Sequence, residues 1–333
     1  MKPLKSFFIS LSALFAFLPA SWGQPYKDSG MVRLKEVNDS IKEAMYYMAL
    51  DSGPDVVHLY IAGTANGHAV VYVHINNYAY RFVFDTGCSR SMINSRRVPT
   101  EPDDSVFLFG KMSGGSGVQK YEGIVKVDSI KLGKWKSGEY LLPMKDMGDP
   151  NGYYGIDGIL GMRQLEGYDI LFDWRDRLIT LCRPYATDSV VSARYDISTS
   201  VPIIVSKDPF GFFIEPEIRS RFKSRQYKLI LDTGSPFCLI PYEARPWLLN
   251  VLPAKMKGLG SGEPVKVRFG HLRYKLGDKK FRHVTTFLVP DEFYTEIDDR
   301  LGLRGMLGMN VLRRGPFLIS VRDSRLVLLK AKK

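Results

Sequence analysis

Two short stretches of this chain place a carboxylate, a hydroxyl and a glycine directly behind an apolar run. The first is FVFDTG at residues 82–87, and the second is LILDTG at residues 229–234. At average amino-acid usage, a given triplet occurs by chance in on the order of a few percent of chains of this length. Two copies, each behind three apolar residues, are much harder to attribute to chance.

Paired carboxyl groups are suited to general acid–base chemistry. Two carboxyls within hydrogen-bonding distance cannot both ionise readily, so they share one proton and titrate at separate pH values. The ionised group can then activate a water molecule as a general base, while the protonated group polarises a carbonyl. Asp85 and Asp232 are therefore the candidate catalytic pair.

The spacing of these stretches indicates an internal duplication. The two aspartates lie 147 positions apart (232 − 85), and each is followed after 73 positions by a glycine, Gly158 or Gly305. Leu165 and Leu312 also lie 147 positions apart. Repeated spacing of this kind predicts two related structural units. A pseudo-twofold axis between the units would bring the two carboxyl groups face to face.

Motifs and spacing together resemble the two-lobed aspartic peptidases of the pepsin and retropepsin superfamily, over about residues 60–330. In that superfamily each lobe supplies one Asp-Thr-Gly loop, and a later apolar-apolar-Gly segment passes beside it. Here those segments are residues 159–161 and 306–308. The resemblance implies a mainly β, bilobal acid-protease fold with two pseudo-twofold-related, β-barrel-like lobes and an N-terminal helical extension.

The resemblance also implies a function. The implied function is that of an aspartic endopeptidase, which hydrolyses polypeptides without a metal or other cofactor. Because one chain carries both half-sites, we expect the protein to be a monomer. The alternative is a peptide-binding or scaffold module that kept the fold and lost catalysis. An intact Asp-Thr-Gly in both copies argues against that alternative.

Residues beside the aspartates are expected to support the pair: Thr86, Gly87, Thr233, Gly234 and Ser235. The glycines allow a tight loop whose N–H groups turn toward the carboxylates. By resemblance, the threonines hydrogen-bond across to the opposite loop, and the Ser235 hydroxyl lies beside its aspartate. Cys88 takes the corresponding place in the first lobe and departs from the usual Ser, Thr or Ala.

A glycine-bearing hairpin that covers the cleft is expected in each half. The candidates are the runs at residues 113–117 and 258–262, which coincide in register because 260 − 147 = 113. Their glycines Gly114, Gly115, Gly260 and Gly262 are the candidate substrate-covering residues; ordinary β-turns are the alternative.

Composition and other motifs exclude several function classes. The formal charge is +12, but no compact basic run interleaved with aromatics is present, so we expect no nucleic-acid partner. The five histidines form no His-x-x-x-His pair, and neither a Gly-x-Ser-x-Gly elbow nor a phosphate loop occurs. A glycosidase would not need twin Asp-Thr-Gly loops. The three cysteines are interpreted as small buried hydrophobes, with at least one unpaired in the chain.

The N-terminal region reads as an export signal followed by a helix. Residues 1–23 begin with positively charged residues and continue with an apolar core too short to span a bilayer. Small residues then precede an expected cleavage site directly before Gln24. The mature protein is thus expected to be exported, periplasmic or secreted, without a stable membrane anchor. Residues 24–60 form the helical extension, with a helix near 31–50 that is either a packing helix or an inhibitory pro-segment.

The remaining chain divides into the two lobes, residues 61–190 and 191–333. Both are read as strand-rich, with a hairpin at Asn76-Asn77 between two of the first strands. The mostly polar stretch 183–200, which carries Pro184, is the expected junction between the lobes.

Overall fold

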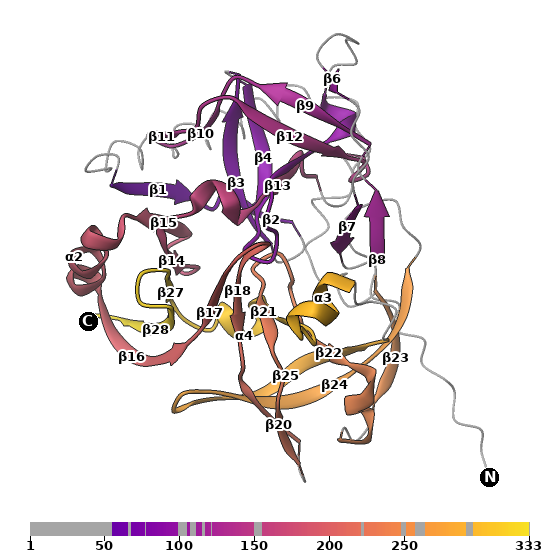
Figure 1. Cartoon of the computed structure of the whole chain (residues 1–333). Helices are drawn as coiled ribbons and strands as arrows, with labels where there is room; N and C mark the ends of the chain where they lie inside the picture. Colours follow the sequence, from indigo (N-terminus) through magenta and orange to yellow (C-terminus); the bar gives the residue numbers. More distant parts are fainter. Residues whose placement is uncertain are drawn as a thin grey trace, which may run out of the picture.

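The computed structural model describes residues 55–332 of the chain, with short internal gaps (Figure 1). The gaps are 66–67, 77, 99–104, 107–110, 115–116, 121, 150–154, 221–222, 248–250, 257–263 and 291–295. The expected signal sequence and the helix near 31–50 lie outside the described residues. No helix in the described part of the chain is long and apolar enough to cross a membrane.

The first lobe is built on one curled sheet, drawn in indigo and magenta in Figure 1. In spatial order its strands are β11 (Trp135–Lys136), β10 (Ile130–Leu132), β3 (His68–Ile75), β4 (Tyr78–Phe84), β13 (Gly158–Leu160), β5 (Met92–Asn94), β12 (Tyr140–Lys145), β9 (Gly123–Val127) and β6 (Ser105–Val106), with β2 (Gly63–Ala65) beside β3. The predicted hairpin is present, because β3 and β4 pair from Val70 opposite Val83 to Ile75 opposite Tyr78. Asn76 takes a positive φ of 47° in this turn, a conformation that Asn tolerates better than most residues.

The second lobe repeats the central strand order of the first. Its strands in spatial order are β17 (Ile204–Lys207), β18 (Phe210–Ile214), β21 (Leu229–Leu231), β26 (Met306–Leu307), β22 (Cys238–Pro241), β25 (Lys279–Val289), β24 (Val265–Leu276), β19 (Glu217–Arg219) and β20 (Ser224–Gln226), with β23 (Leu252–Met256) beside β24. The run β18-β21-β26-β22 corresponds to β3-β4-β13-β5. In both lobes the strand before the Asp-Thr-Gly loop pairs in parallel with the later strand of the apolar-apolar-Gly segment, β4 with β13 and β21 with β26.

A third sheet joins the lobes. Its strands in order are β1 (Val56–Tyr60), β15 (Leu178–Cys182), β14 (Asp169–Asp173), β27 (Phe317–Ser320), β28 (Arg325–Ala331) and β16 (Tyr195–Pro202). At its centre, β14 from the first half pairs with β27 from the second, with Ile170 opposite Ile319. The mainly β, bilobal prediction is therefore confirmed.

The boundaries of the lobes differ from the sequence prediction at two places. The strand β1 belongs to the joining sheet, because its apolar residues are buried against β15, so residues 56–60 are not part of a helical extension. The predicted boundary after residue 190 falls inside α2 (Pro184–Arg194), which begins with a proline at its first turn. This helix packs Val191 against Leu171 and Leu318 of the joining sheet.

The other short helices are α3 (Glu296–Leu301), α4 (Met309–Leu312) and the 3₁₀ turns η1 (Ser95–Arg97), η3 (Met162–Leu165) and η4 (Tyr242–Trp247). The turns η3 and α4 follow β13 and β26 directly, one in each lobe. Their first residues bind the two loops, because Met162 N–H donates to Cys88 O at 2.9 Å and Met309 N–H donates to Ser235 O at 2.8 Å.

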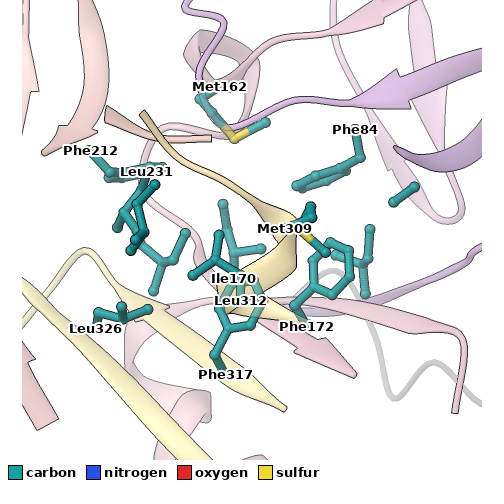
Figure 2. Close-up of a cluster of buried hydrophobic side chains, with 14 of the residues drawn as sticks. Phe84, Met162, Ile170, Phe172, Phe212, Leu231, Met309, Leu312, Phe317 and Leu326 are labelled. Atoms are coloured by element: carbon teal, nitrogen blue, oxygen red, sulfur yellow. The ribbon is translucent and has the colours of Figure 1, made fainter. Parts of the chain in front are cut away.

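The hydrophobic core is continuous between the lobes (Figure 2). Phe84, the residue before Asp85, meets Phe172 edge-to-face with ring centroids 6.3 Å apart. Phe172 in turn stacks on Phe317 of the second half at 5.2 Å, with the planes only 6° apart. Buried aromatic pairs contribute about 0.5–1.5 kcal/mol beyond the area they bury. The lobe that carries Asp85 is thus fixed to the joining sheet from both halves.

Candidate active site

The two Asp-Thr-Gly loops lie at equivalent places in the two lobes. Asp85 follows β4 and its N–H donates to Leu160 O at 3.1 Å; Asp232 follows β21 and its N–H donates to Leu307 O, also at 3.1 Å. The hydrogen bonds between the parallel strands, β4 with β13 and β21 with β26, therefore continue up to each aspartate. The positions of both carboxyls are set by buried strands, not by the loops alone.

The two threonines bind the loops to each other. Thr86 N–H donates to Thr233 Oγ1 and Thr233 N–H donates to Thr86 Oγ1, both at 3.0 Å. Each hydroxyl then donates to the opposite lobe, Thr86 Oγ1 to Leu231 O and Thr233 Oγ1 to Phe84 O, both at 2.7 Å. Both side chains are buried. The four hydrogen bonds form the symmetric cross-link that the resemblance implied.

The glycines of the loops pack against the opposite carboxyl groups. A Cβ atom placed on Gly87 would lie 2.6 Å from Asp232 Cγ, and one placed on Gly234 would lie even closer to Asp85 Cγ. Gly87 N–H also donates to Asp85 Oδ1 at 2.8 Å. Any larger residue here would push the carboxyls apart, so the glycines set how closely the two lobes meet.

Glycines beneath the loops allow close packing as well. A Cβ on Gly161 would meet the backbone of Arg90, with its O at 2.7 Å. A Cβ on Gly308 would meet the carbonyl of Phe237, the position equivalent to Arg90 in the duplication, and would lie 2.8 Å from Ser235 O. The matched contacts explain why both apolar-apolar-Gly segments end on glycine.

Both carboxyl groups hold a proton more tightly than an ordinary aspartate does. Burial raises the pKa of Asp85, while the N–H groups of Gly87, Cys88 and Gly234 and the hydrogen bond with Asp232 oppose that rise. The pKa of Asp232 lies well above its usual value, because of burial, the nearby charge of Asp85 and the hydrogen bond between the two carboxyls. Between its two apparent pKa values the pair therefore holds one proton, which the two carboxyl groups share.

The residue after each glycine has a different role from the one expected. The Ser235 hydroxyl donates to Phe237 O at 2.8 Å, not to the carboxyl of Asp232. Its N–H donates to the main-chain carbonyl of Asp232 at 3.4 Å and, being close to the Asp232 carboxyl, opposes the rise in the pKa of that group. The Cys88 thiol makes the matching contact in the first lobe, to Arg90 O at 3.1 Å. Cysteine therefore replaces the hydroxyl without changing the loop, because both side chains bond the carbonyl two residues on.

The three cysteines are free thiols. Cys182 on β15 and Cys238 on β22 are fully buried, and burial raises the pKa of each thiol to about 12. Burial and the charge of Asp85 place the pKa of Cys88 well above its ordinary value too. None of the three is a thiolate near neutral pH, which agrees with their interpretation as small hydrophobes.

The glycine-bearing hairpins are described only in part. Gly114 ends β7 (Lys111–Gly114), which pairs with β8 (Gly117–Lys120) as a separate two-stranded sheet. Gly115 lies outside the described residues. Gly260 and Gly262 also lie outside them, in the connection between β23 and β24, whose last described pair is Met256 with Val265.

One residue near the site was not identified from the sequence. His68, the first residue of β3, is buried with its Nδ1 lacking a hydrogen-bond partner, and burial lowers its pKa to about 4 while the nearby backbone of Gly234 in the opposite loop opposes that shift. In the sequence this residue is one of five histidines without a metal-binding pattern. A lone histidine on a strand carries no sequence signal for a contact with the other lobe.

Comparisons with known proteins agree with this geometry. A family model described as "Aspartyl protease" matches residues 71–163, which include the first Asp-Thr-Gly loop. The structure is similar to the crystal structure of the aspartic proteinase from Irpex lacteus, with a TM-score of 0.52 and 15% sequence identity over 83% of this chain and 97% of that chain. A comparison with curated protein sequences gave no match. The chain thus has the aspartic-peptidase fold.

Proposed function

We propose that this protein is an aspartic endopeptidase in which Asp85 and Asp232 hydrolyse peptide bonds. The observation that carries the proposal is the pair of carboxyls on opposed Asp-Thr-Gly loops, whose backbones are bound to each other through Thr86 and Thr233 and whose pKa values are both raised by burial. The family match and the fold of the Irpex lacteus enzyme support the same class of reaction.

The pair supplies one base and one acid. Ionised Asp85 removes a proton from a water molecule, whose oxygen attacks the scissile carbonyl carbon, while Asp232 gives its proton to the carbonyl oxygen. The result is a neutral tetrahedral diol, with the proton now on Asp85 and Asp232 ionised. Collapse of the diol breaks the C–N bond as Asp85 protonates the leaving nitrogen and Asp232 recovers a hydroxyl proton. Both carboxyls return to their starting states, so no cofactor takes part.

The loops supply fixed dipoles for this cycle. The N–H groups of Gly87 and Gly234 interact with Asp85, and those of Gly234 and Ser235 with Asp232. Because these donors belong to loops bound to each other through Thr86 and Thr233, they need little rearrangement as charge moves between the carboxyls.

The substrate and setting follow from the same proposal. A polypeptide in extended form would lie across the two loops, with the β7–β8 hairpin around Gly114 covering it and excluding water. We place the mature enzyme outside the cytoplasm, after removal of residues 1–23. N-terminal sequencing of the exported protein should begin at Gln24.

A transition-state analogue tests the activity against the alternative of an inactive peptide-binding module. A statine-type peptide, whose hydroxyl imitates the tetrahedral diol, should inhibit cleavage and bind at least about a hundredfold more tightly than the matched substrate peptide. Equal binding of the two peptides together with no cleavage would support the binding module.

A further inference from the structure

The second lobe carries a long hairpin with a large excess of positive charge. Its strands β24 and β25 lie side by side and are drawn in orange in Figure 1. Residues 265–289, which form the hairpin, contain seven lysine and arginine residues and one acid, Asp278 in the turn. Their formal charge of +6 (7 − 1) is half of the +12 of the whole chain. The mechanism proposed above uses none of these side chains.

One face of this hairpin is apolar at one end and basic at the other. Alternate residues of a strand lie on the same face. On β24 this face carries, in order, Phe269, His271, Arg273 and Lys275. The intervening Leu272 and Tyr274 belong to the hydrophobic core on the opposite face. His271 and Arg273 are exposed and Lys275 is half-buried, so the basic end of the face is open to solvent.

Like charges stand directly opposite each other on these strands. Lys275 is paired with Lys280 of β25, and Arg273 is paired with Arg219 of β19. Like charges in directly opposite positions destabilise a sheet. Arg219 has an ion pair with Glu217, whereas neither Arg273 nor Lys280 forms one within the described part of the chain. The fold therefore carries a repulsion that its own acids do not compensate.

A bulge and a neighbouring helix bring further cations to this place. The register of β25 shifts opposite Arg273, so that both Arg282 and His283 oppose it, and both are exposed. Arg314, which follows α4, donates from Nη1 to Arg282 O at 3.1 Å. We call the five cations paired or adjacent across these strands the basic face: Arg219, Arg273, Lys275, Lys280 and Arg282. An anionic partner on this face would relieve the repulsion between them.

The apolar end of the same hairpin face adjoins one Asp-Thr-Gly loop. Phe269 lies opposite Phe287 of β25, with ring centroids 5.6 Å apart. Phe287 in turn meets Phe237 at 5.1 Å, and Phe237 lies five residues after Asp232. From Phe269 to Arg273 the strand advances about 13 Å, or about four extended residues. A polypeptide that leaves the loops over these rings would therefore reach the basic face within a short distance.

We propose that the basic face is a docking surface for an acidic stretch of the polypeptide substrate, outside the cleavage site itself. The partner's identity as substrate rests on the proposed peptidase function, but the binding of acidic polypeptide does not. Carboxylates of the docked stretch would pair with Arg273 and Lys280, which have no acid of their own. Docking raises the concentration of the scissile bond at the aspartate pair, so it lowers KM and leaves the chemical step unchanged.

Two double variants with the same change of charge separate this surface from general electrostatic attraction. Arg273→Gln combined with Lys280→Gln removes two cations of the basic face. Because it also removes two like-charge pairs, it should not weaken the fold. The matched control combines Lys136→Gln with Lys330→Gln, two exposed lysines on β11 and β28. Circular dichroism and a thermal melt first establish that both proteins are folded.

The first readout needs no cleavage. Fluorescence anisotropy measures binding of the mature protein to a labelled peptide of alternating glutamate and glycine, with a glutamine–glycine peptide as the reference. The wild-type protein and the control should bind the glutamate peptide about tenfold more tightly than the reference. The basic-face variant should lose this preference, and about 0.5 M sodium chloride should remove it from all three proteins.

The second readout is the KM for one cleaved peptide that carries either the glutamate–glycine or the glutamine–glycine extension, placed at each end in turn. With the wild-type protein and the control, the acidic extension should lower KM by about tenfold at one end or both, with the same kcat. In the basic-face variant the ratio of the two KM values should fall to about one.

The outcomes separate the two proposals. No preference for glutamate in the wild-type protein, or an equal loss in both double variants, would overturn the docking surface. Binding of heparin or of anionic phospholipid vesicles without binding of the glutamate peptide would also overturn it. Glutamate binding without an effect on KM would show that the partner is not the substrate. If no form of the protein cleaves peptides, the peptidase proposal fails, and anisotropy alone decides whether the basic face binds acidic polypeptide.

Discussion

Thr86 and Thr233 exchange reciprocal hydrogen bonds of equal length, each N–H donating to the other hydroxyl at 3.0 Å. Through these bonds each lobe fixes the loop of the other. The position of the aspartate pair is thus a property of the interface between the lobes and not of either lobe alone.

Removal of one hydroxyl from this pair should weaken both loops. Thr86→Val keeps the shape of the side chain but leaves Leu231 O and Thr233 N–H buried without partners, at a cost of about 1–3 kcal/mol for each group. Urea unfolding should show this loss, and kcat should fall with it. Thr86→Ser keeps the hydroxyl and should remain close to wild type; a valine variant as stable as the serine variant would contradict the cross-link.

An added methyl group at the loop glycine should separate the carboxyls. In Gly234→Ala the new Cβ would overlap the carboxyl of Asp85, so we expect at least about a hundredfold loss of activity. Gly138→Ala is the control, because a Cβ there would meet nothing within 4 Å. Peptide cleavage rates of the two variants are the measurement, and similar rates in both would show that the close approach is not required.

A buried carboxylate outside the site should stabilise the joining sheet. Asp169 accepts hydrogen bonds from Val321 N–H at 2.7 Å and from Thr187 Oγ1 at 2.8 Å, so it connects β14 with the second lobe and with α2. Asp169→Asn replaces an acceptor by a donor and should lower the free energy of unfolding by about 1–3 kcal/mol.

The control for this change is Asp188→Asn, which removes an exposed ion pair with Arg322 and should cost about 0–1 kcal/mol. Thermal melts of the two variants give the comparison. Equal melting temperatures would mean that Asp169 does not help to hold the lobes together.

His68 should also make the fold less stable as the pH falls. The unfolded chain binds a proton on this side chain near pH 6.5, whereas burial lowers the pKa in the folded protein to about 4. Between these values the unfolded state binds more protons, so stability decreases with falling pH, by about 3 kcal/mol in total, and the effect levels off below pH 4.

The difference in unfolding free energy between wild type and His68→Leu isolates this contribution, because the aspartate pair titrates in both proteins. Relative to the leucine variant, the wild-type protein should lose stability from pH 6.5 down to pH 4. A constant difference over that range would show that the ring is protonated in the folded protein.

The sequence predicted the parts of the site that the duplication repeats. Asp85, Thr86 and Gly87 recur as Asp232, Thr233 and Gly234, and repeated spacing identifies both the fold and the pair of loops. Contacts that are present in only one lobe produce no repeated residues in the sequence, so the spacing could not predict them. His68 is buried near the backbone of Gly234 in the other lobe, and the matching hairpin has Gly211 in its place, so no repeated signal exists.

Local differences were missed for similar reasons. The helix α2 occupies a stretch whose polar composition suggested a simple connection, because only Thr187 and Val191 of its side chains are buried. The strand β1 precedes the duplicated region, and its pairing with β15 depends on tertiary contact. The Ser235 hydroxyl was expected beside Asp232 by resemblance, whereas loop geometry directs it to Phe237 O.

Digestion of a diverse peptide library by the mature protein from pH 3 to 8, in parallel with Asp85→Asn and Asp232→Asn, tests whether the two aspartates are catalytic. We expect cuts by the wild-type protein and none by either variant, with all three proteins folded. The pH profile should have two limbs, one for each apparent pKa of the pair. Cleavage retained in either variant would contradict the assignment of Asp85 and Asp232 as the catalytic pair.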